Sequence, residues 1–356
     1  MSAPLQAAYQ SRSVFVSGHT GFKGGWLSTW LGQLGAAVSG YALAPNTTPS
    51  LFELAGIGEQ MAASTLADIG ERERLTLAMQ AAQPSIVFHL AAQPLVRLSY
   101  REPVATWATN VMGTVNLLEA VRACPSVKAV VVVTTDKCYD NREWPWGYRE
   151  NDALGGHDPY SASKAGAELV AQSYRKSFLA EAGVLLASAR AGNVIGGGDW
   201  SEDRLIPDAA RAVAAGQPLL IRNPQATRPW QHVLESLHGY LLLGAGLLAG
   251  RAELAQAFNF GPEPGDNQPV EAVLRGLQAE WPELRWELDP AAAHAVHEAR
   301  FLYLDSAKAR QMLDWQPRWR LPAALTQTAR WYRTVQARPN LSRSMMLQQL
   351  EIFQHG

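Results

Sequence analysis

The sequence predicts an α/β protein with a doubly wound parallel sheet, followed by a smaller C-terminal α/β lobe. Short apolar runs alternate with helical patterns through the first half of the chain, which is typical of this fold class. A glycine-rich segment directly follows the first apolar run. After about Gly192 the alternation breaks down, and arginine and proline become frequent. The first half is therefore expected to carry the sheet, and the second half a lobe above it.

Five apolar runs are expected to form strands, at residues 14–17, 37–43, 86–90, 129–133 and 184–189. The run at 129–133 is one alanine followed by four valines, which suits the buried middle of a parallel sheet. Apolar residues at helical spacing predict helices over 26–35, 104–123 and 161–178. Strand and helix in this order predict right-handed crossover connections.

A chain of 356 residues exceeds the usual size of a single core, so one large or two joined domains are expected. Residues 12–192 are predicted to form the sheet domain. Residues 193–335 are predicted to form a substrate-binding lobe over the carboxyl edge of the sheet, with a candidate strand returning to the sheet near 257–261. Residues 336–356 form a C-terminal tail, in which 342–356 has a helical pattern.

Composition argues against several classes of partner. With 47% hydrophobic and 18% charged residues and a net charge of −1, the chain has no general attraction for nucleic acid or an acidic membrane. The most apolar stretch, 240–250, is too short and too glycine-rich to span a bilayer. Cys124 and Cys138 are the only cysteines, which indicates no disulfide framework. No secretion signal opens the sequence, so a cytoplasmic location is expected.

The glycine-rich segment has the spacing of a dinucleotide cradle. Glycines permit a tight turn and close backbone approach, and the amides of the following helix face the pyrophosphate, as in a Rossmann-type domain. This arrangement predicts NAD as cofactor. The residues of the G-x-x-G-x-x-G segment are Gly18, His19, Thr20, Gly21, Phe22, Lys23 and Gly24.

Other residues are expected along the same cofactor. Asp68 and Ile69, after a further strand expected between 43 and 68, are candidates for the adenine end, and Ala91, Ala92 and Gln93 follow the strand expected at 86–90. Residues 40–45 lack the acid that often binds the ribose hydroxyls at the end of the second strand. NADP therefore stays open, with Lys23 as a candidate partner for its extra phosphate.

Two further segments carry groups suited to proton transfer. Tyr160 and Lys164 lie one turn apart on a predicted helix, so the ammonium is expected to lower the pKa of the phenol and allow it to act as a base. Thr135, Asp136 and Lys137 directly follow the strand at 129–133, at the edge where open α/β sheets bind ligands. We expect the two segments to meet in one cleft.

These motifs together resemble the extended short-chain dehydrogenase/reductase family. The glycine segment, the Y-x-x-x-K pair and Asn110-Val111-Met112-Gly113-Thr114 carry this resemblance. Within the family the chain is most similar to the nucleotide-sugar 4,6-dehydratases. This closer similarity extends over roughly residues 12–335 and rests on the segments 134–139, 141–152, 228–233 and 302–308.

The resemblance implies a mechanism. Tyr160, assisted by Lys164 and Thr135, takes the proton of the sugar C4 hydroxyl during oxidation; Asp136 is the acid that protonates the departing C6 hydroxyl. Better-known relatives have Thr-Asp-Glu at this segment, whereas this chain has Lys137 in place of the glutamate. Lys137 is accordingly the candidate base for the C5 proton, provided that its pKa is depressed.

The resemblance also implies CDP-glucose as substrate. Its two phosphates call for cations and amides in the second lobe, and the candidates are Asn193, Arg204, Arg222, Arg228 and Arg300. No metal site is expected, because His232, His294 and His297 lack a third ligand at suitable spacing.

Two other functions remain open, a nucleotide-sugar 4-epimerase and a non-catalytic dinucleotide sensor. Asp136 and Lys137 favour dehydration over epimerisation, and the Tyr160–Lys164 pair argues against a sensor. Apolar faces on residues 104–123 and 161–178 predict a homodimer or homotetramer, paired through a four-helix bundle as in relatives.

Overall fold

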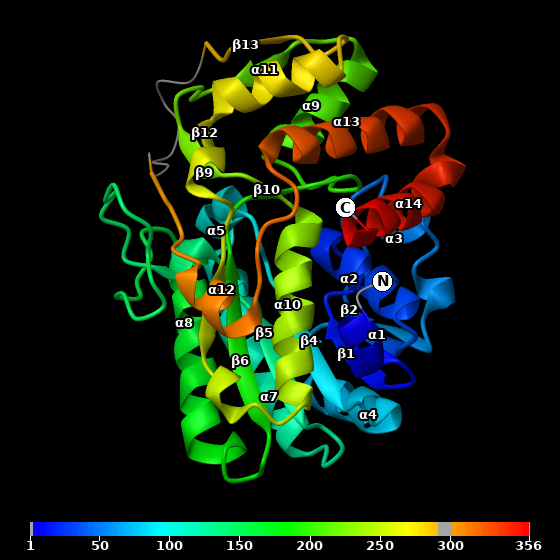
Figure 1. The fold of residues 1–356 in the computed structure, drawn as a ribbon, viewed down its shortest axis with the longest axis vertical. Helices are drawn as coiled ribbons and strands as arrows, with labels where there is room; N and C mark the ends of the chain where they lie inside the picture. Colours follow the sequence, from blue (N-terminus) through cyan, green and yellow to red (C-terminus); the bar gives the residue numbers. More distant parts are fainter. Residues whose placement is uncertain (1–2, 291–300, 356) are drawn as a thin grey trace.

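A seven-stranded parallel sheet forms the centre of the molecule in the computed structural model, which describes residues 3–290 and 301–355 (Figure 1). The strand order is β11-β6-β5-β4-β1-β2-β3. This confirms the predicted fold class. The strands are β1 (Ser13–Ser17), β2 (Ala37–Ala42), β3 (Ala63–Leu66), β4 (Ile86–His89), β5 (Ala129–Val133), β6 (Leu185–Ala191) and β11 (Ala257–Phe260).

Helices cover both faces of this sheet, because successive residues of each strand point to opposite sides. In β5, Val131 packs with the core on the side of α2 (Phe22–Gln33) and α10 (Val233–Leu248). Val130 and Val132 pack on the other side. The helices there are α4 (Arg72–Ala82), α7 (Gly113–Arg122) and α8 (Pro159–Tyr174). All five residues of β5 are buried, as its unbroken apolar run predicts.

The helix predicted over 104–123 is interrupted. It consists of α6 (Pro103–Trp107), a π-helical turn (Ala108–Met112) and α7. Within the π turn Asn110 is buried; its oxygen accepts from the Gln93 amide at 2.8 Å and its amide donates to Ser163 Oγ at 2.8 Å. These contacts join the loop after β4 to α8, and the local apolar pattern does not encode them. A second π turn (Arg175–Leu179) follows α8.

The second half of the chain contributes both to a small lobe and to the main sheet. The lobe, at the top of Figure 1, contains the short pairs β8–β13 and β9–β12. β11 lies beside β6, with Phe258 opposite Ala189, and α10 packs on the sheet. The elements concerned are α9 (Leu205–Ala215), β8 (Leu219–Ile221), β9 (Thr227–Pro229), β12 (Asn267–Pro269), α11 (Val270–Glu280), β13 (Trp286–Leu288), α12 (Ala307–Leu313) and α13 (Leu321–Ala337).

Short elements and the C-terminal helix complete the fold. In α14 (Ser342–His355), Phe353 packs edge-on against Trp30 of α2, with ring centroids 5.6 Å apart. Among residues 3–290 and 301–355, no helix has the length and apolar character needed to cross a bilayer. The remaining elements are α1 (Ala3–Tyr9), α3 (Leu51–Leu54), α5 (Val96–Arg101), β7 (Val194–Ile195) and β10 (Gln231–His232).

Candidate active site

The glycine segment forms a tight cradle between β1 and α2. Gly18 has a φ of +81°, and a Cβ there would lie 2.6 Å from the Ala91 backbone nitrogen. A Cβ on Gly24 would lie 2.0 Å from the Gly18 oxygen. Gly21 precedes α2 and provides no side-chain cap, so the first amides of the helix are open to an anion. The segment thus has the geometry that a dinucleotide pyrophosphate requires.

The side chains within this segment point in different directions. The His19 ring is buried between strands, where its Nε2 lies 2.8 Å from Ser64 Oγ, and burial lowers its pKa to about 4. Thr20 Oγ1 donates to the Leu43 carbonyl at 2.8 Å. Only backbone atoms of His19 are therefore placed to meet a phosphate.

The side chain of Lys23 extends towards α10, and not towards the end of β2, where the extra phosphate of NADP would lie. Its Nζ donates to the Tyr240 hydroxyl of α10 at 3.3 Å. Burial, together with the nearby cations Arg204 and Lys164, lowers its pKa to about 7. Lys23 thus lies among catalytic residues, and not at the end of β2 where a ribose phosphate would lie.

The candidate adenine end is formed by the turn after β3. Asp68 is exposed, and its Oδ1 accepts from the Gly70 amide at 2.7 Å, while Ile69 is buried. The Tyr41 hydroxyl donates to the Asp68 carbonyl at 3.0 Å and joins β2 to this turn. Ala91 N lies 3.3 Å from Ser17 Oγ, which holds the loop after β4 close to the cradle.

The catalytic candidates meet where α8 crosses the end of β5. Asp158 caps α8 by accepting from the Ser161 amide at 2.9 Å, and Pro159 begins the helix. Lys164 Nζ donates to the Val133 carbonyl at 3.2 Å, and the Thr135 hydroxyl is hydrogen-bonded to Tyr160. The predicted convergence of the two segments is therefore present.

The electrostatics of the Tyr–Lys pair differ from the simple expectation. Burial raises the pKa of Tyr160 to about 12, and the groups that lower it are Thr135, through a hydrogen bond, and Arg204, through its charge. Burial also lowers the pKa of Lys164 to about 8. The lysine is thus not the main group lowering the pKa of the phenol in this structure.

Asp136 and Lys137 lie beside this pair in a short 3-10 turn (Asp136–Cys138). Asp136 is fully buried, and its Oδ1 accepts from Thr135 Oγ1 at 2.8 Å. Lys137 Nζ lies 3.8 Å from the same oxygen and donates to Asn193 Oδ1 at 3.4 Å. A buried carboxyl and a partly exposed amine thus lie together at the carboxyl edge of the sheet.

The arginine candidates occupy separate places. Arg204 forms an ion pair with buried Asp199 at 2.9 Å, and its charge acts on Tyr160. Arg222 lies 3.9 Å from Asp203. Arg228, in β9, donates to the Thr227 carbonyl at 2.9 Å. Arg300 lies outside the described residues. Of the five phosphate candidates, the structure brings Arg204 and Asn193 to the catalytic groups.

Metal ligands are not gathered in the part of the chain that the structure describes. His232 is buried, and its ring packs edge-on against Trp26 and Trp319. His294 and His297 lie outside the described residues.

The sequence analysis missed several groups of the site. Asp199 orients Arg204, Tyr240 accepts from Lys23, and Arg97 binds Asp203 at 3.0 Å. Glu168 is buried one turn after Lys164 on the same face of α8. Only Glu168 had a sequence signal, its i+4 spacing from Lys164; the other contacts join segments far apart in the chain.

Fold and site together define a short-chain dehydrogenase/reductase: a Rossmann-type sheet, a glycine cradle and a Tyr–Lys pair at the carboxyl edge. The chain belongs to the GDP-mannose 4,6-dehydratase family, whose sequence profile matches residues 15–246, within the extended branch of that class. It is 51% identical over 331 residues to the CDP-glucose 4,6-dehydratase of Salmonella typhimurium, and the match covers 91% of each chain.

Solved structures with the same fold include both epimerases and dehydratases. An epimerase, Mth375 of Methanothermobacter thermautotrophicus, superposes with a TM-score of 0.77 at 22% identity, covering 96% of each chain. The dTDP-glucose 4,6-dehydratase of Bacillus anthracis, in complex with NAD, superposes with a TM-score of 0.75 at 21% identity, covering 92% of this chain and 98% of that one. Fold alone therefore does not separate the two activities.

Proposed function

We propose that the chain is a nucleotide-sugar 4,6-dehydratase that converts CDP-D-glucose to CDP-4-keto-6-deoxy-D-glucose and water, a hydro-lyase reaction in deoxysugar precursor synthesis. The observation that carries the proposal is the grouping of Tyr160, Asp136 and Lys137 at one sheet edge, in a chain that shares half its residues with a CDP-glucose 4,6-dehydratase. Dehydration needs a base for the C4 hydroxyl, a base for C5 and an acid for the C6 hydroxyl, and these three side chains can supply them.

The residues divide the work as follows. Tyr160, hydrogen-bonded to Thr135, takes the C4 hydroxyl proton, and Arg204 and Lys164 provide positive charge nearby. Lys137 takes the C5 proton, which the new C4 carbonyl acidifies. Asp136 donates a proton to the C6 hydroxyl, which leaves as water. Each well-placed acid or base contributes roughly 10²–10⁴-fold to the rate.

NAD fits the cradle as cofactor. The glycine backbone from Gly18 to Gly24 and the open amides of α2 would hold its pyrophosphate, with the turn at Asp68 and Ile69 and the loop at Ala91, Ala92 and Gln93 alongside. When bound, NAD supplies a hydride acceptor for C4 and a donor for C6, so the reaction is internally balanced. The B. anthracis structure in complex with NAD supports the choice.

The first alternative is a nucleotide-sugar 4-epimerase, which shares the fold. Epimerisation needs no acid for a leaving hydroxyl and no C5 base, so buried Asp136 and neighbouring Lys137 favour dehydration. A non-catalytic dinucleotide sensor is the second alternative, and it gives no reason for a buried Tyr160–Lys164 pair. Neither alternative fits this site as well.

The direct test is incubation of the purified protein and NAD with CDP-glucose, followed by mass spectrometry. Dehydration lowers the mass of the nucleotide sugar by one water, whereas an epimer keeps its mass. Glucose linked to UDP, dTDP and GDP, assayed in parallel, would establish which base is read. Tyr160→Phe is the matched negative control. Tight NAD binding without turnover of any of the four would favour the sensor.

We further propose that the protein is a homodimer or a homotetramer in the cytoplasm. The paired faces would be those of residues 104–123 and 161–178. Exposed apolar side chains lie in α6, in the π turn after it and in α8: Val104 is 82% exposed, and Trp107, Met112 and Leu169 are also exposed. Sedimentation at micromolar concentration should give at least a dimer. Val104→Asp with Leu169→Asp should shift it towards monomer if this face is the interface.

The division at residue 192 into a cofactor domain and a substrate lobe, with 336–356 as a tail, is likewise a proposal. Asn193, Arg204, Arg222, Arg228 and Arg300 all fall beyond that residue. We assign them to the nucleotide and sugar. Of these, Asn193 and Arg204 would lie nearest the reacting carbons, because they contact the catalytic side chains or act on them through charge.

A further inference from the structure

Three side chains form a row along α8 over the end of β5. Tyr160, Lys164 and Glu168 follow one another at intervals of four residues, so they share one face of the helix. The row is buried throughout. Each residue of the row contacts one of three consecutive residues at the end of β5. Thr135 is hydrogen-bonded to Tyr160, and the Val133 carbonyl accepts from Lys164. Thr134 Oγ1 donates to Glu168 Oε1 at 2.5 Å. The mechanism above uses the first two members and leaves Glu168 without a task.

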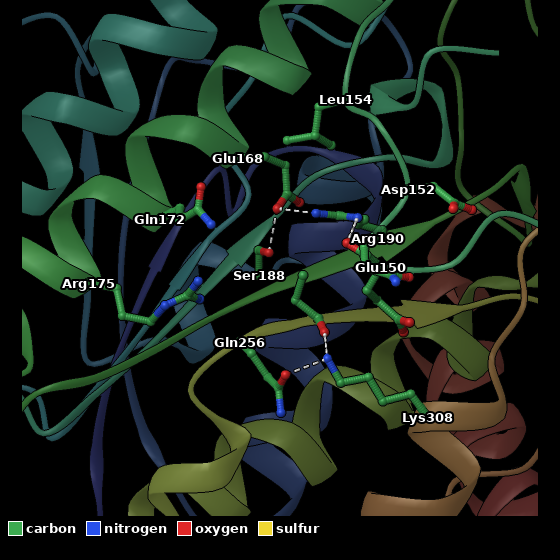
Figure 2. A pocket seen from close by; sticks show the side chains of 12 residues that line it. Glu150, Asp152, Leu154, Glu168, Gln172, Arg175, Ser188, Arg190, Gln256 and Lys308 are labelled. Atoms are coloured by element: carbon green, nitrogen blue, oxygen red, sulfur yellow. Dashed lines mark hydrogen bonds and ion pairs between the residues drawn. The ribbon is translucent and has the colours of Figure 1, made fainter.

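Glu168 is held as a carboxylate by three donors. Besides Thr134, Ser188 Oγ donates to Oε2 at 2.7 Å and Arg190 Nη2 to the same oxygen at 2.8 Å (Figure 2). Burial acts to raise the pKa of Glu168, but Arg190 and the two hydroxyls outweigh it and hold the pKa below its ordinary value. The arginine is itself fixed, because it also donates to the Tyr139 hydroxyl at 2.8 Å. The negative charge therefore persists at neutral pH.

A negative charge near Lys164 favours the ammonium form of its side chain. Its amine is buried, and burial lowers its pKa to about 8. The group that acts most to raise it is Glu168. Lys23 of α2 lies in the field of Lys164, and so does His89 of β4, whose pKa burial lowers to about 3.

We propose that Glu168 is a positioning residue of the active site, whose carboxylate keeps Lys164 in its ammonium form beside Tyr160. Thr134 and Arg190 hold the carboxylate in place. This proposal adds a residue to the proposed dehydratase site, and its consequence for catalysis rests on that proposed function. Removing the negative charge should leave Lys164 largely neutral at pH 8, and most of the positive charge beside the phenol would be lost.

The ion pair of Glu168 and Arg190 lines a cavity of about 480 Å³. Glu150 and Arg175 also line it, and Figure 2 shows them around Glu168 and Arg190. Arg175 lies in the field of Glu168 from the π turn after α8. Glu150 lines the same cavity but lies in a turn before α8, outside the row, so it supplies a matched control.

The first measurement is the charge of Lys164 itself, which does not depend on activity. Lysine labelled with ¹³C at the ε carbon reports the protonation of each amine by NMR, and the Lys164 signal is the one missing in Lys164→Met. Glu168→Gln should lower the pKa of Lys164 by about one unit or more, since a nearby opposite charge commonly shifts a pKa by roughly 1–3 units. Glu150→Gln should leave it unchanged. An unmoved Lys164 signal in Glu168→Gln would overturn the inference.

Breaking a buried pair can destabilise the fold, so a second variant replaces both partners. In Glu168→Gln with Arg190→Met, no unpaired guanidinium remains. If this variant melts within a few degrees of wild type and Lys164 still titrates at wild-type pH, the inference is wrong. The alkaline limb of kcat against pH should move down with the Lys164 pKa in both variants. A wild-type protein that turns over no nucleotide sugar would refute the proposed function, while the NMR titration would still decide the role of Glu168.

Discussion

The side-chain oxygen of Asn193 accepts a hydrogen bond from Lys137 Nζ at 3.4 Å, across the gap between the ends of β5 and β6. This contact gives the amine a fixed direction at the carboxyl edge of the sheet. The amine also lies 3.8 Å from Asp136 Oδ1, so acid and base are neighbours. A single side of the sugar ring would face both groups, so water would be lost across C5 and C6 on that side.

Lys137→Met should separate the first oxidation from the loss of water. With no C5 base, overall turnover should fall by roughly 10²–10⁴-fold, while NAD binding is retained. The measurement is incorporation of solvent deuterium at C5 of the sugar, which should disappear together with water loss. Asn193→Asp is the companion variant, because it keeps an acceptor for the amine. Wild-type deuterium incorporation in Lys137→Met would exclude Lys137 as the base.

Gly24→Ala should abolish NAD binding. A Cβ at this position would lie 2.0 Å from the Gly18 oxygen, so the cradle must open to admit it. Gly21→Ala is the matched control, since its Cβ would lie 3.5 Å from the same oxygen, an ordinary contact, at a φ of −82°. Calorimetric titration with NAD measures both. Equal affinities in the two variants would contradict the proposed cofactor position.

Arg204→Met should shift the acid limb of the pH–rate profile to higher pH. The charge of Arg204 lowers the pKa of Tyr160, and Tyr160 must lose its proton to act as a base. Without that charge the phenol holds its proton to higher pH. Arg204→Lys keeps a cation and should shift the limb less. An acid limb at the wild-type pH in Arg204→Met would show that another group sets it.

The free energy of unfolding should depend on pH through the titration of Glu235. This buried residue of α10 accepts from the backbone amides of Trp319 at 2.7 Å and Arg318 at 3.0 Å, yet burial raises its pKa to about 7. The folded state therefore binds more protons than the unfolded state between about pH 4.3 and 7, so this contribution to stability is present below that range and is lost as pH rises through it.

The measurement for Glu235 is thermal unfolding at several pH values. The fall in Tm between pH 5 and pH 8 should be smaller in Glu235→Gln than in wild type. The variant should also melt lower at pH 5, because its one oxygen replaces two acceptors and leaves an amide unpaired, at a cost of about 1–3 kcal/mol. Glu119→Gln, near the surface and bonded to Arg122, should keep the wild-type slope. Parallel curves for wild type and Glu235→Gln would contradict the prediction.

The central sheet could be predicted from sequence because its signals are local. The valines at 130–133 are buried on both faces, and every strand expected in the first half is present. The glycine cradle and the row of Tyr160 and Lys164 are likewise short motifs, read directly from spacing. The π turn at Ala108–Met112 was not predicted, because it depends on Asn110 meeting Gln93 and Ser163 in the folded chain.

Charge balance in the site could not be read from sequence. The pair of Tyr160 and Lys164 suggested that the ammonium lowers the phenol pKa. Burial dominates both groups, and the groups that lower the pKa of Tyr160 are Thr135, through a hydrogen bond, and then Arg204, through its charge. Lys23 was considered for a cofactor phosphate, and it instead meets Tyr240, a residue far along the chain. Such contacts depend on tertiary packing, which motif spacing does not report.

The pairing of β11 with β6 has a consequence for engineering and for evolution. Residues 257–260 form the edge strand of the main sheet, next to β6. The second half of the chain therefore cannot be exchanged as a separate module. A chimaera that takes residues 193–335 from a related protein with another sugar preference would also contain that protein's edge strand. The side chains of this strand must pack against Ala189 and its neighbours in β6. Changes of specificity in this lineage are therefore more accessible through individual loops than through wholesale grafting.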